Sequence, residues 1–526
     1  MAGKLHTFQE TIRKPSVRSI LTAIFLFAVF FLLLSASMQK SLDHDEHQFI
    51  AGGMLLAKQT SFPYLDYAYF HMPNMVFIYA ALFAFTDHLL LAARLFSTLC
   101  TWLTLVLIFL VAFRLFRSYP YLIRFLIAAG AVSLLLTNPV FAYTSGKAWN
   151  HDLPILLTLI AFILHSEAAK RENGRTWLFF SGLFVGLAIG TRLTFAPIVL
   201  PFLIMILLFP RRAGWREVVF LILSFALGLF VGLLPSLILL ALAPGQFVFG
   251  NLDYAAYNTL YRQQEGFIEG DVSSIAMSFG GKLSYLARYV LNTPSTALLL
   301  LAFLFFVVSN SARLWRKPPY WFQVAFSLIL LPFLLIGSFA PTPAFYQYFY
   351  APIPFLLVGV LYGIASFRDQ NDRLNWSTVL LANIIVIASA FGLKLYQDVD
   401  ILMTPDRWLP IRAHHIGLEI ETIVGDGPVL TLAPLFPLEG GVSIYEEFAT
   451  GPFAWRIAPL VPDEERQRVG LIAEPNLVDL LDARPPAAIL LGNEGVLEQP
   501  FVEYAEQHGY QPLELSDGKT LWSASP

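Results

Sequence analysis

Three acidic residues stand within four positions just after the first long apolar run of the chain: Asp43, Asp45 and Glu46, in SLDHDEHQF. The apolar core of a bilayer does not tolerate such a cluster, so we expect it at the membrane surface or in a polar cavity that opens there. A carboxylate in that place can take the proton of an attacking hydroxyl or amine. It can also bind a divalent cation. A solvated surface loop is the alternative interpretation.

A second polar group precedes a later apolar segment, in the sequence KAWNHDLP, which supplies Lys147, Asn150, His151 and Asp152. If both polar groups lie on one side of the membrane, their acids can line one pocket. Helix capping is the alternative, because Asp152 before Pro154 suits the first turn of a helix. The two interpretations are compatible.

Two arginines lie near apolar segments, where an unpaired charge is costly and is usually functional. Arg192 stands between two short apolar segments in GTRLTFAP, and Arg94 stands near the start of the second long one. A phosphate group is the best partner, because the guanidinium matches it with two parallel hydrogen bonds. Snorkelling to the membrane interface is the alternative for both.

Aromatic side chains surround these positions. Tyr67 belongs to an aromatic run that ends at His71-Met72-Pro73, and Tyr346 and Tyr348 lie beside a later apolar segment. An interfacial aromatic belt explains Tyr346 and Tyr348, and stacking against a sugar is the alternative that would give them a function.

The composition is that of a polytopic membrane protein. The 526 residues are 56% hydrophobic and only 13% charged, whereas ordinary soluble proteins carry about 25% charged residues. The net charge of −3 and the lack of a basic stripe argue against nucleic-acid binding. The single cysteine, Cys100, excludes an internal disulfide and a cysteine metal cluster.

Eleven apolar segments have about the length that a membrane-spanning helix needs, and the first reads as a retained helix and not as a cleaved signal peptide. They lie at about 19–38, 90–113, 121–139, 153–167, 177–191, 194–209, 218–241, 294–311, 320–338, 348–366 and 376–394. The sequence therefore predicts an α-helical transmembrane domain over residues 1–394.

Basic residues predict the orientation, because Lys and Arg are enriched in cytoplasmic loops. With the N-terminus inside, every inner loop is basic; these loops hold Arg18 in the tail, Arg114 with Arg117, Lys170 with Arg171 and Arg175, Arg211 with Arg212 and Arg216, Arg313 with Arg316 and Lys317, and Arg368 with Arg373. The outer side then holds loops 39–89 and 242–293 and the chain after Lys394. Within the first outer loop, apolar residues from Phe49 to Ala57 and from Met72 to Phe85 predict two helices in the plane of the interface.

The last part of the chain, residues 395–526, reads as a small α/β domain outside the membrane. Short apolar runs predict strands at Pro428–Ala433 and Ala487–Gly492. Helical periodicity predicts helices at Glu474–Ala483 and Gln499–His508.

The order of these motifs resembles the GT-C membrane glycosyltransferases, and most closely the branch of the protein O-mannosyltransferases and the lipid A aminoarabinose transferases. The resemblance rests on DEHQFIAGGMLLAKQTSFPYLDYAYFHMPNMVFIYAALFAF, LAARLFSTL, WNHDLP, GLAIGTRLTFAP and FYQYFYAPIPFL, and covers roughly residues 20–365. It implies transfer of a sugar, with inversion, from a polyprenyl-phosphate carrier to a lipid, glycan or protein acceptor on the outer face.

The resemblance also implies roles for single residues. Asp45 matches the catalytic base with Glu46 beside it, Asp152 matches a second-loop acid, and Arg192 matches a basic residue after the fifth span. His71 stands where many members have the lysine of a Lys-Pro-Pro element, so this sequence departs from the pattern there. We group the remaining candidates as phosphate-binding, namely Arg94 and Lys147, and as substrate-binding, namely Asp43, Tyr67, His151, Tyr346 and Tyr348.

Two functions of other classes compete with this one. A transporter or flippase would show two matching halves with paired ionisable groups near the midplane, but here the polar groups crowd one surface. A receptor or assembly protein would leave the acidic loop inert. We expect a monomeric enzyme of the inner or plasma membrane that acts in cell-envelope glycosylation and needs no cofactor, with a divalent cation at Asp43, Asp45 and Glu46 as the alternative.

Overall fold

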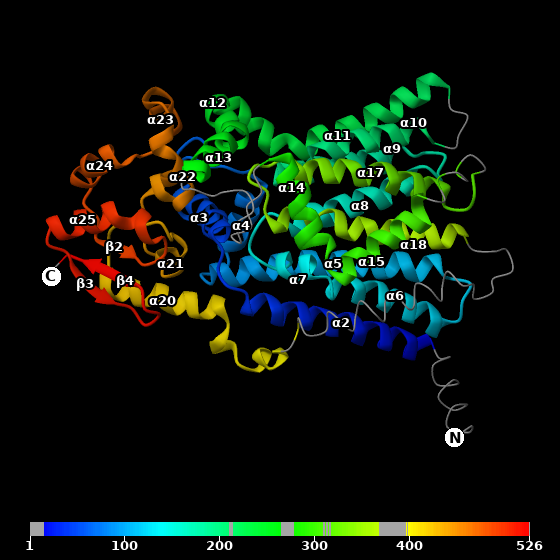
Figure 1. Cartoon of the computed structure of the whole chain (residues 1–526), viewed down its shortest axis with the longest axis horizontal. Coiled ribbons are helices and arrows are strands. Elements are labelled where there is room, and N and C mark those ends of the chain that lie inside the picture. The colour runs from blue at the N-terminus through cyan, green and yellow to red at the C-terminus, as the bar shows by residue number, and fades with distance from the viewer. Residues whose placement is uncertain are drawn as a thin grey trace.

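Long helices lie side by side in a bundle, and the C-terminal strands and short helices gather at one end of it (Figure 1). The computed structural model describes residues 15–209, 214–264, 278–308, 311, 314, 317–367, 396 and 398–524. The bundle helices are α2 (Pro15–Gln39), α5 (Leu89–Leu115), α6 (Tyr121–Leu136), α8 (Asp152–Ala168), α9 (Arg175–Thr191), α10 (Val199–Leu207), α11 (Trp215–Leu242), α15 (Pro294–Phe303), α17 (Trp321–Phe339) and α18 (Pro352–Phe367).

The bundle is that of a multi-pass membrane protein. Five of the described helices are by themselves long and apolar enough to cross a membrane, and a pair bent by 105°, Phe279–Leu291 with Pro294–Val308, would make a sixth. The shorter helices α6, α8, α9 and α10 occupy the places of the shorter predicted segments. Segment 376–394 lies outside the described residues, so eleven spans stay a prediction.

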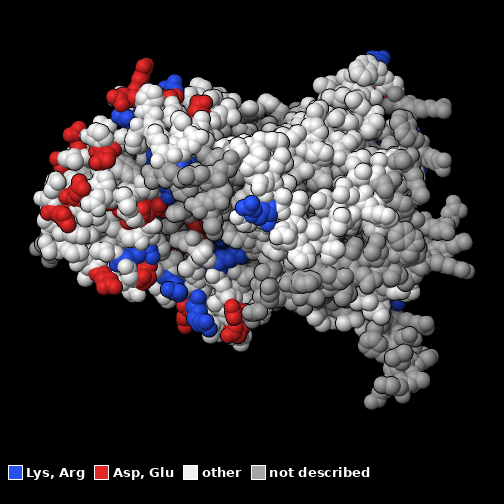
Figure 2. Space-filling view, in the orientation of Figure 1, with Lys and Arg blue, Asp and Glu red and all other residues white. Residues whose placement is uncertain are grey.

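Charge is distributed unevenly over the visible surface (Figure 2). Acidic and basic side chains gather over the C-terminal elements, whereas the flank of the bundle is largely uncharged. A hydrocarbon environment requires such an uncharged band.

Helices α9 and α11 pack with their backbones in direct contact, because glycines face each other along both helices. A methyl group added at Gly182 would lie 2.0 Å from the carbonyl oxygen of Phe225, and one added at Gly228 would lie 1.9 Å from that of Phe179. Gly186 and Gly232 repeat the pattern four residues later. Small residues at this spacing let two membrane helices pack backbone to backbone. Arg192 directly follows the C-terminal end of α9.

Two short helices cover the end of the bundle that faces the C-terminal elements: α3 (His44–Gln59) and α4 (Asn74–Phe83). Both occupy the segments predicted to lie in the interface plane, and α4 has only ten residues, too few to span. The C-terminal elements hold α3 from the other side: His44 Nδ1 lies 2.7 Å from Glu494 Oε1, and the backbone nitrogen of Leu435 lies 3.4 Å from His47 Nδ1.

Short connecting elements complete the membrane part. They are α7 (Pro139–Thr144), η1 (Leu193–Ile198), α12 (Pro244–Val248), η2 (Phe249–Asp253), α13 (Tyr254–Gln264), α14 (Phe279–Tyr285), η3 (Leu286–Leu291), η4 (Leu304–Val308) and η6 (Tyr346–Phe349). Of these, η1 begins directly after Arg192, and η6 contains Tyr348.

The C-terminal elements surround a four-stranded sheet in the order β1-β2-β4-β3. The strands are β1 (Val429–Thr431), β2 (Ala488–Leu491), β3 (Gln511–Glu514) and β4 (Thr520–Ser523); β1 and β2 are parallel and the other pairs antiparallel. Strands β1 and β2 lie within the two predicted segments. Both are buried along their whole length, as continuous apolar runs require.

Helices and short turns flank this sheet. The helices are α20 (Leu409–Val424), α21 (Leu435–Glu439), α22 (Pro452–Ile457), α23 (Asp463–Val469), α24 (Leu477–Ala483) and α25 (Gln499–Gln507), and the turns are η8 (Val399–Met403), η9 (Pro405–Arg407), η10 (Glu446–Phe448), η11 (Ala458–Leu460), η12 (Glu474–Asn476) and η13 (Gly495–Glu498). Elements η12 with α24, and α25, coincide with the two predicted helices. The predicted boundary at residue 394 lies outside the described residues.

Candidate active site

The acidic motif is the start of helix α3, and a capping box fixes it. Asp43 Oδ1 accepts a hydrogen bond from the backbone nitrogen of Asp45 at 3.3 Å, and Glu46 Oε2 accepts one from the backbone nitrogen of Asp43 at 3.1 Å. This reciprocal arrangement satisfies backbone donors that the first turn leaves free. The carboxylates of Asp43 and Glu46 are therefore part of the cap, whereas that of Asp45 is not.

Glu46 and Arg94 form a fully buried, two-pronged ion pair. Arg94 Nε lies 2.8 Å from Glu46 Oε1 and Arg94 Nη2 lies 2.7 Å from Glu46 Oε2. The remaining Arg94 donors bind the carbonyl oxygens of Ser37, Lys40 and Ser41. All five guanidinium N–H groups are thus used, so the geometry favours a positioning role for both residues and leaves Arg94 no donor for a phosphate.

Asp43 is also paired with a cation. Lys147 Nζ lies 2.9 Å from Asp43 Oδ2, and the ammonium sits 4.9 Å from the ring centre of Tyr143 and 4.7 Å from that of Trp149. This contact joins the two polar loops that the sequence singled out.

Asp45 has no Lys or Arg within ion-pair distance in the described part of the chain. Its Oδ1 accepts a hydrogen bond from Gln48 Nε2 at 3.0 Å and lies 4.0 Å from His71 Nε2. Burial, and next the like charge of Asp43, raise the pKa of Asp45 to about 6, although Arg192 opposes that shift. A carboxylate tuned in this way can accept a proton near neutral pH.

His71 is a neutral partner of Asp45. Its Nε2 lies 3.0 Å from Gln48 Nε2, so Gln48 bridges the two side chains. Burial, and next the positive charge of Arg192, lower the pKa of His71 to about 3. A neutral imidazole brings no charge to a phosphate.

Arg192 ends helix α9, and its extended backbone turns the guanidinium back toward the second polar loop. Nη1 lies 2.5 Å from Asn150 Oδ1 and 3.1 Å from His151 Nε2, and Nε lies 3.1 Å from Thr194 Oγ1. The guanidinium carbon also lies 5.0 Å from the ring centre of Tyr348. Every partner is neutral, so the positive charge stays available for an anionic ligand.

A cavity of about 480 Å³ opens between these side chains. Its lining includes the polar residues His71, Asn150, Arg192, Tyr348 and Tyr254, whereas Asp45 is not part of the lining and lies behind His71, 4.0 Å from its Nε2. An apolar cavity of about 620 Å³ lies on the other side of the end of α9, lined by α4, α8, α9 and α11. Thr191 lines the apolar cavity and the next residue, Arg192, lines the polar one.

The other predicted site residues lie elsewhere. Asp152 is buried and accepts hydrogen bonds from Tyr350 Oη and the Gly146 nitrogen at 2.8 Å each. Neither Asp152 nor Asp45 is among the residues that line the 480 Å³ cavity, so the two acids do not share its wall. Tyr67 is buried against Tyr69, and Tyr346 packs on Tyr143.

Sequence reasoning missed Gln48, although one signal was available. Gln48 follows Asp45 by three positions on a helix, which places the two side chains on one face. No motif reveals its second contact, to His71, because that depends on how the segment after α3 folds back.

The acidic motif is poorly suited to a divalent cation. Lys147 neutralises Asp43 and Arg94 neutralises Glu46. Among the described residues, the three-ligand group with metal-like spacing is a different one, Asp87 with His88 and His414.

Comparison with known proteins gives the fold. Residues 71–238 match the family model of the dolichyl-phosphate-mannose-protein mannosyltransferases. The crystal structure of ArnT from Cupriavidus metallidurans bound to undecaprenyl phosphate aligns with 98% of this chain and 100% of its own, at 14% identity and a TM-score of 0.59. Its apo state aligns with 97% and 99%, at 13% identity and a TM-score of 0.58. No curated protein matches the sequence.

The chain has a GT-C glycosyltransferase fold. This confirms the resemblance drawn from the motifs, and the matched segment begins at His71 and includes Arg94, Asp152 and Arg192. Within this fold, Asp45 lies in the first turn of α3 and Arg192 directly follows α9.

Proposed function

We propose that this protein transfers a sugar from a polyprenyl-phosphate carrier to an acceptor at the outer face of a cell membrane. The observation that carries the proposal is that Arg192 and His71 line one polar cavity and that Asp45 lies directly beside His71. Asp45 Oδ1 lies 4.0 Å from His71 Nε2, and the cavity that His71 and Arg192 line is followed at Thr191 by an apolar one.

The two cavities suit the two ends of such a donor. The 620 Å³ cavity presents almost only apolar side chains, from Phe77, Leu157, Leu187 and Ile238 among others, which suits an isoprenoid tail. Arg192 stands at its polar border and can bind the phosphate through Nη2, because Nε and Nη1 already contact Thr194, Asn150 and His151. The solved GT-C relative ArnT was crystallised with undecaprenyl phosphate, which supports a polyprenyl donor.

The chemistry needs one base. The acceptor hydroxyl or amine attacks the anomeric carbon, its proton passes to Asp45, and the bond from that carbon to the phosphate oxygen breaks. The electron pair of that bond leaves with the polyprenyl phosphate, and Arg192 stabilises the added charge. A phosphate leaves without an acid to protonate it, so a second catalytic carboxylate is unnecessary, in contrast to hydrolases that use two.

Orientation follows from the same proposal. Arg114, Lys170, Arg175 and Arg216 lie at the helix ends remote from α3 and the C-terminal elements. Since cytoplasmic loops are rich in Lys and Arg, the N-terminus is inside and the site outside. A bacterial inner membrane fits this arrangement.

Turnover by the purified protein tests the proposal. The protein in detergent is mixed with undecaprenyl-phosphate-linked hexoses and pentoses and a membrane-lipid extract as acceptor, and release of undecaprenyl phosphate is measured. Detergent removes the two compartments that a flippase needs, so release indicates transferase chemistry. Binding of undecaprenyl phosphate without release from any donor would instead support a carrier, and neither binding nor release would refute the proposal.

A further inference from the structure

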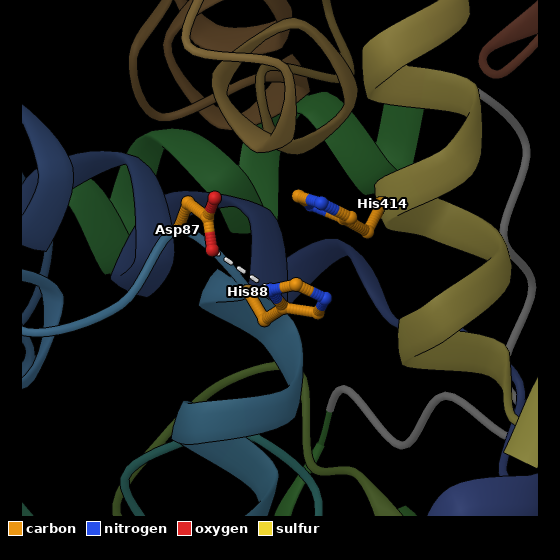
Figure 3. A group of neighbouring side chains, drawn as sticks. All are labelled: Asp87, His88 and His414. Carbon is orange, nitrogen blue, oxygen red and sulfur yellow. Dashed lines mark hydrogen bonds and ion pairs between the residues drawn. The ribbon is translucent and has the colours of Figure 1, made fainter.

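Asp87, His88 and His414 converge at a place remote in sequence from the acidic motif, where the bundle meets the C-terminal elements (Figure 3). Asp87 and His88 come directly before α5, and His414 comes from α20. Each offers one metal-ligand atom, and the three atoms lie within 4.8 Å of one another. In the described part of the chain, no other group of three His, Cys, Asp or Glu residues meets this spacing.

A buried carboxylate orients His414. His414 Nδ1 lies 3.1 Å from Glu439 Oε2, and because an ionised carboxylate only accepts, Nδ1 carries the proton and Nε2 keeps its lone pair. Glu439 is itself held by the backbone nitrogens of Leu89 and Leu90, at 3.2 and 2.7 Å. Metal-binding histidines regularly donate their second nitrogen to a carboxylate in this way.

We propose that Asp87, His88 and His414 bind a divalent transition-metal ion, with Zn²⁺ the best fit, and that Glu439 orients His414 for it. Two imidazoles and one carboxylate suit Zn²⁺, whereas Mg²⁺ and Ca²⁺ take oxygen ligands. Water completes a tetrahedral set at the fourth position.

The side chains can close on an ion with small movements. Bonds of about 2.0–2.2 Å separate tetrahedral ligands by roughly 3.4 Å, so ligand atoms that lie within 4.8 Å of one another must approach by up to about 1.4 Å. The rings of His88 and His414 are stacked at 3.9 Å and 22°, and His88 Nδ1 lies 2.8 Å from Asp87 Oδ1, so His88 must turn to present a nitrogen to the ion. His88 is 38% and Asp87 is 81% exposed, whereas His414 is 7% exposed; the two mobile ligands therefore close on a fixed one.

The ion would link the start of α5 to α20, and so the bundle to the C-terminal elements. This role does not depend on the proposed transfer reaction. A ligand that binds only the folded state raises its stability with concentration, so the link has a readout that is separate from activity.

Metal binding to the full chain tests the inference. The tag-free protein is stripped with a chelator, and Zn²⁺ affinity is measured by competition with a chromophoric chelator, alongside the absorption spectrum of bound Co²⁺ and the Zn²⁺-induced rise in Tm. We expect one tightly bound ion, and at least about 10-fold weaker binding in Asp87→Ala, His88→Ala and His414→Ala. His415→Ala, which removes the exposed histidine next to His414 on α20, is the matched control.

Each outcome decides the matter. Equal Zn²⁺ affinity in the wild type and in Asp87→Ala and His88→Ala, or no Zn²⁺-induced rise in Tm, overturns the inference. Asp87→Ala guards against a folding artefact, because an 81% exposed side chain can be removed with little effect on stability. Loss in the three ligand variants but not in His415→Ala supports it.

Discussion

Asp45 and Arg192 are the two charged side chains of the site whose charge no fixed counter-ion cancels. Glu46 and Asp43, one and two positions from Asp45, are both paired with cations. Arg192 contacts only neutral groups. Uncompensated charges at a membrane surface are costly. A substrate that brings a phosphate to Arg192 and a proton to Asp45 would compensate both charges.

Replacement of Arg192 tests the phosphate contact. Arg192→Gln should weaken binding of undecaprenyl phosphate by about 1.5–3 kcal/mol, the worth of a hydrogen bond to a charged group. Arg192→Lys should recover only part of this, because an ammonium cannot both keep the contacts to Thr194, Asn150 and His151 and reach the phosphate. Binding is measured in detergent, and Arg175→Gln, an exposed arginine at the other end of α9, is the control. Unchanged affinity in Arg192→Gln would make Arg192 an interfacial anchor.

The pH dependence of transfer tests the state of Asp45. A base must be ionised, and its pKa is raised to about 6, so kcat/KM should fall about tenfold per pH unit below pH 6 and level off above it. Asp43→Asn removes a like charge and frees Lys147, and both changes lower the pKa of Asp45. The inflection of the pH profile should therefore move to lower pH in that variant, and a flat profile between pH 5 and 7 would exclude Asp45 as the titrating base.

At the scale of elements, helix α5 holds the acidic motif in place through Arg94. Arg94→Gln leaves Glu46 as a buried, unpaired charge and should destabilise the protein by about 3–5 kcal/mol. The double variant Glu46→Gln/Arg94→Gln should recover much of this loss, because it removes both charges. Thermal unfolding in detergent measures the effect, with the exposed Arg114 on the same helix as the control site. Additive losses in the double variant would contradict the pairing.

Apolar length and periodicity predicted the elements well, but they placed the start of α3 at Phe49 and missed the capping box that begins it at His44, and they predicted side-chain partners poorly. The segment before Phe49 carries its own capping box, so the position of α3 follows from local residues. Arg94 was a candidate phosphate ligand because the sequence shows its place in an apolar helix but not the Glu46 carboxylate, 48 positions away, that the fold brings to it. Pairings of this kind depend on tertiary packing and not on spacing.

At the scale of the whole molecule, Glu439 joins the C-terminal elements to the bundle. Its carboxylate caps the first turn of α5 and binds His414. No motif marks this contact in the sequence, because Glu439 is the last residue of the short helix α21 and its partners are brought to it by tertiary packing. It places the C-terminal elements against the end of the bundle that holds Asp45.

Glu439→Gln should loosen that junction. The amide keeps one acceptor but loses the charge that raises the pKa of His414, so stability should fall by about 1–3 kcal/mol. The contact of His414 with Glu439 contributes most to the free energy of unfolding below pH 6.5, where the histidine is protonated in the unfolded state as well. This contribution is lost as the pH rises through the raised pKa of His414 in the folded state. The difference between wild type and Glu439→Gln should therefore shrink at alkaline pH. Thermal unfolding at several pH values measures it, and Glu421→Gln, an exposed site on α20, should show no such difference.

Transfer by the Asp45→Asn variant tests the central claim most directly. The amide preserves the shape of the side chain and an acceptor for Gln48, so folding and binding of undecaprenyl phosphate should persist. Release of undecaprenyl phosphate from its linked sugars should fall by roughly 10²-fold or more, because the acceptor proton has no base to receive it. Near-normal release in this variant, at equal donor binding, would remove Asp45 from the mechanism.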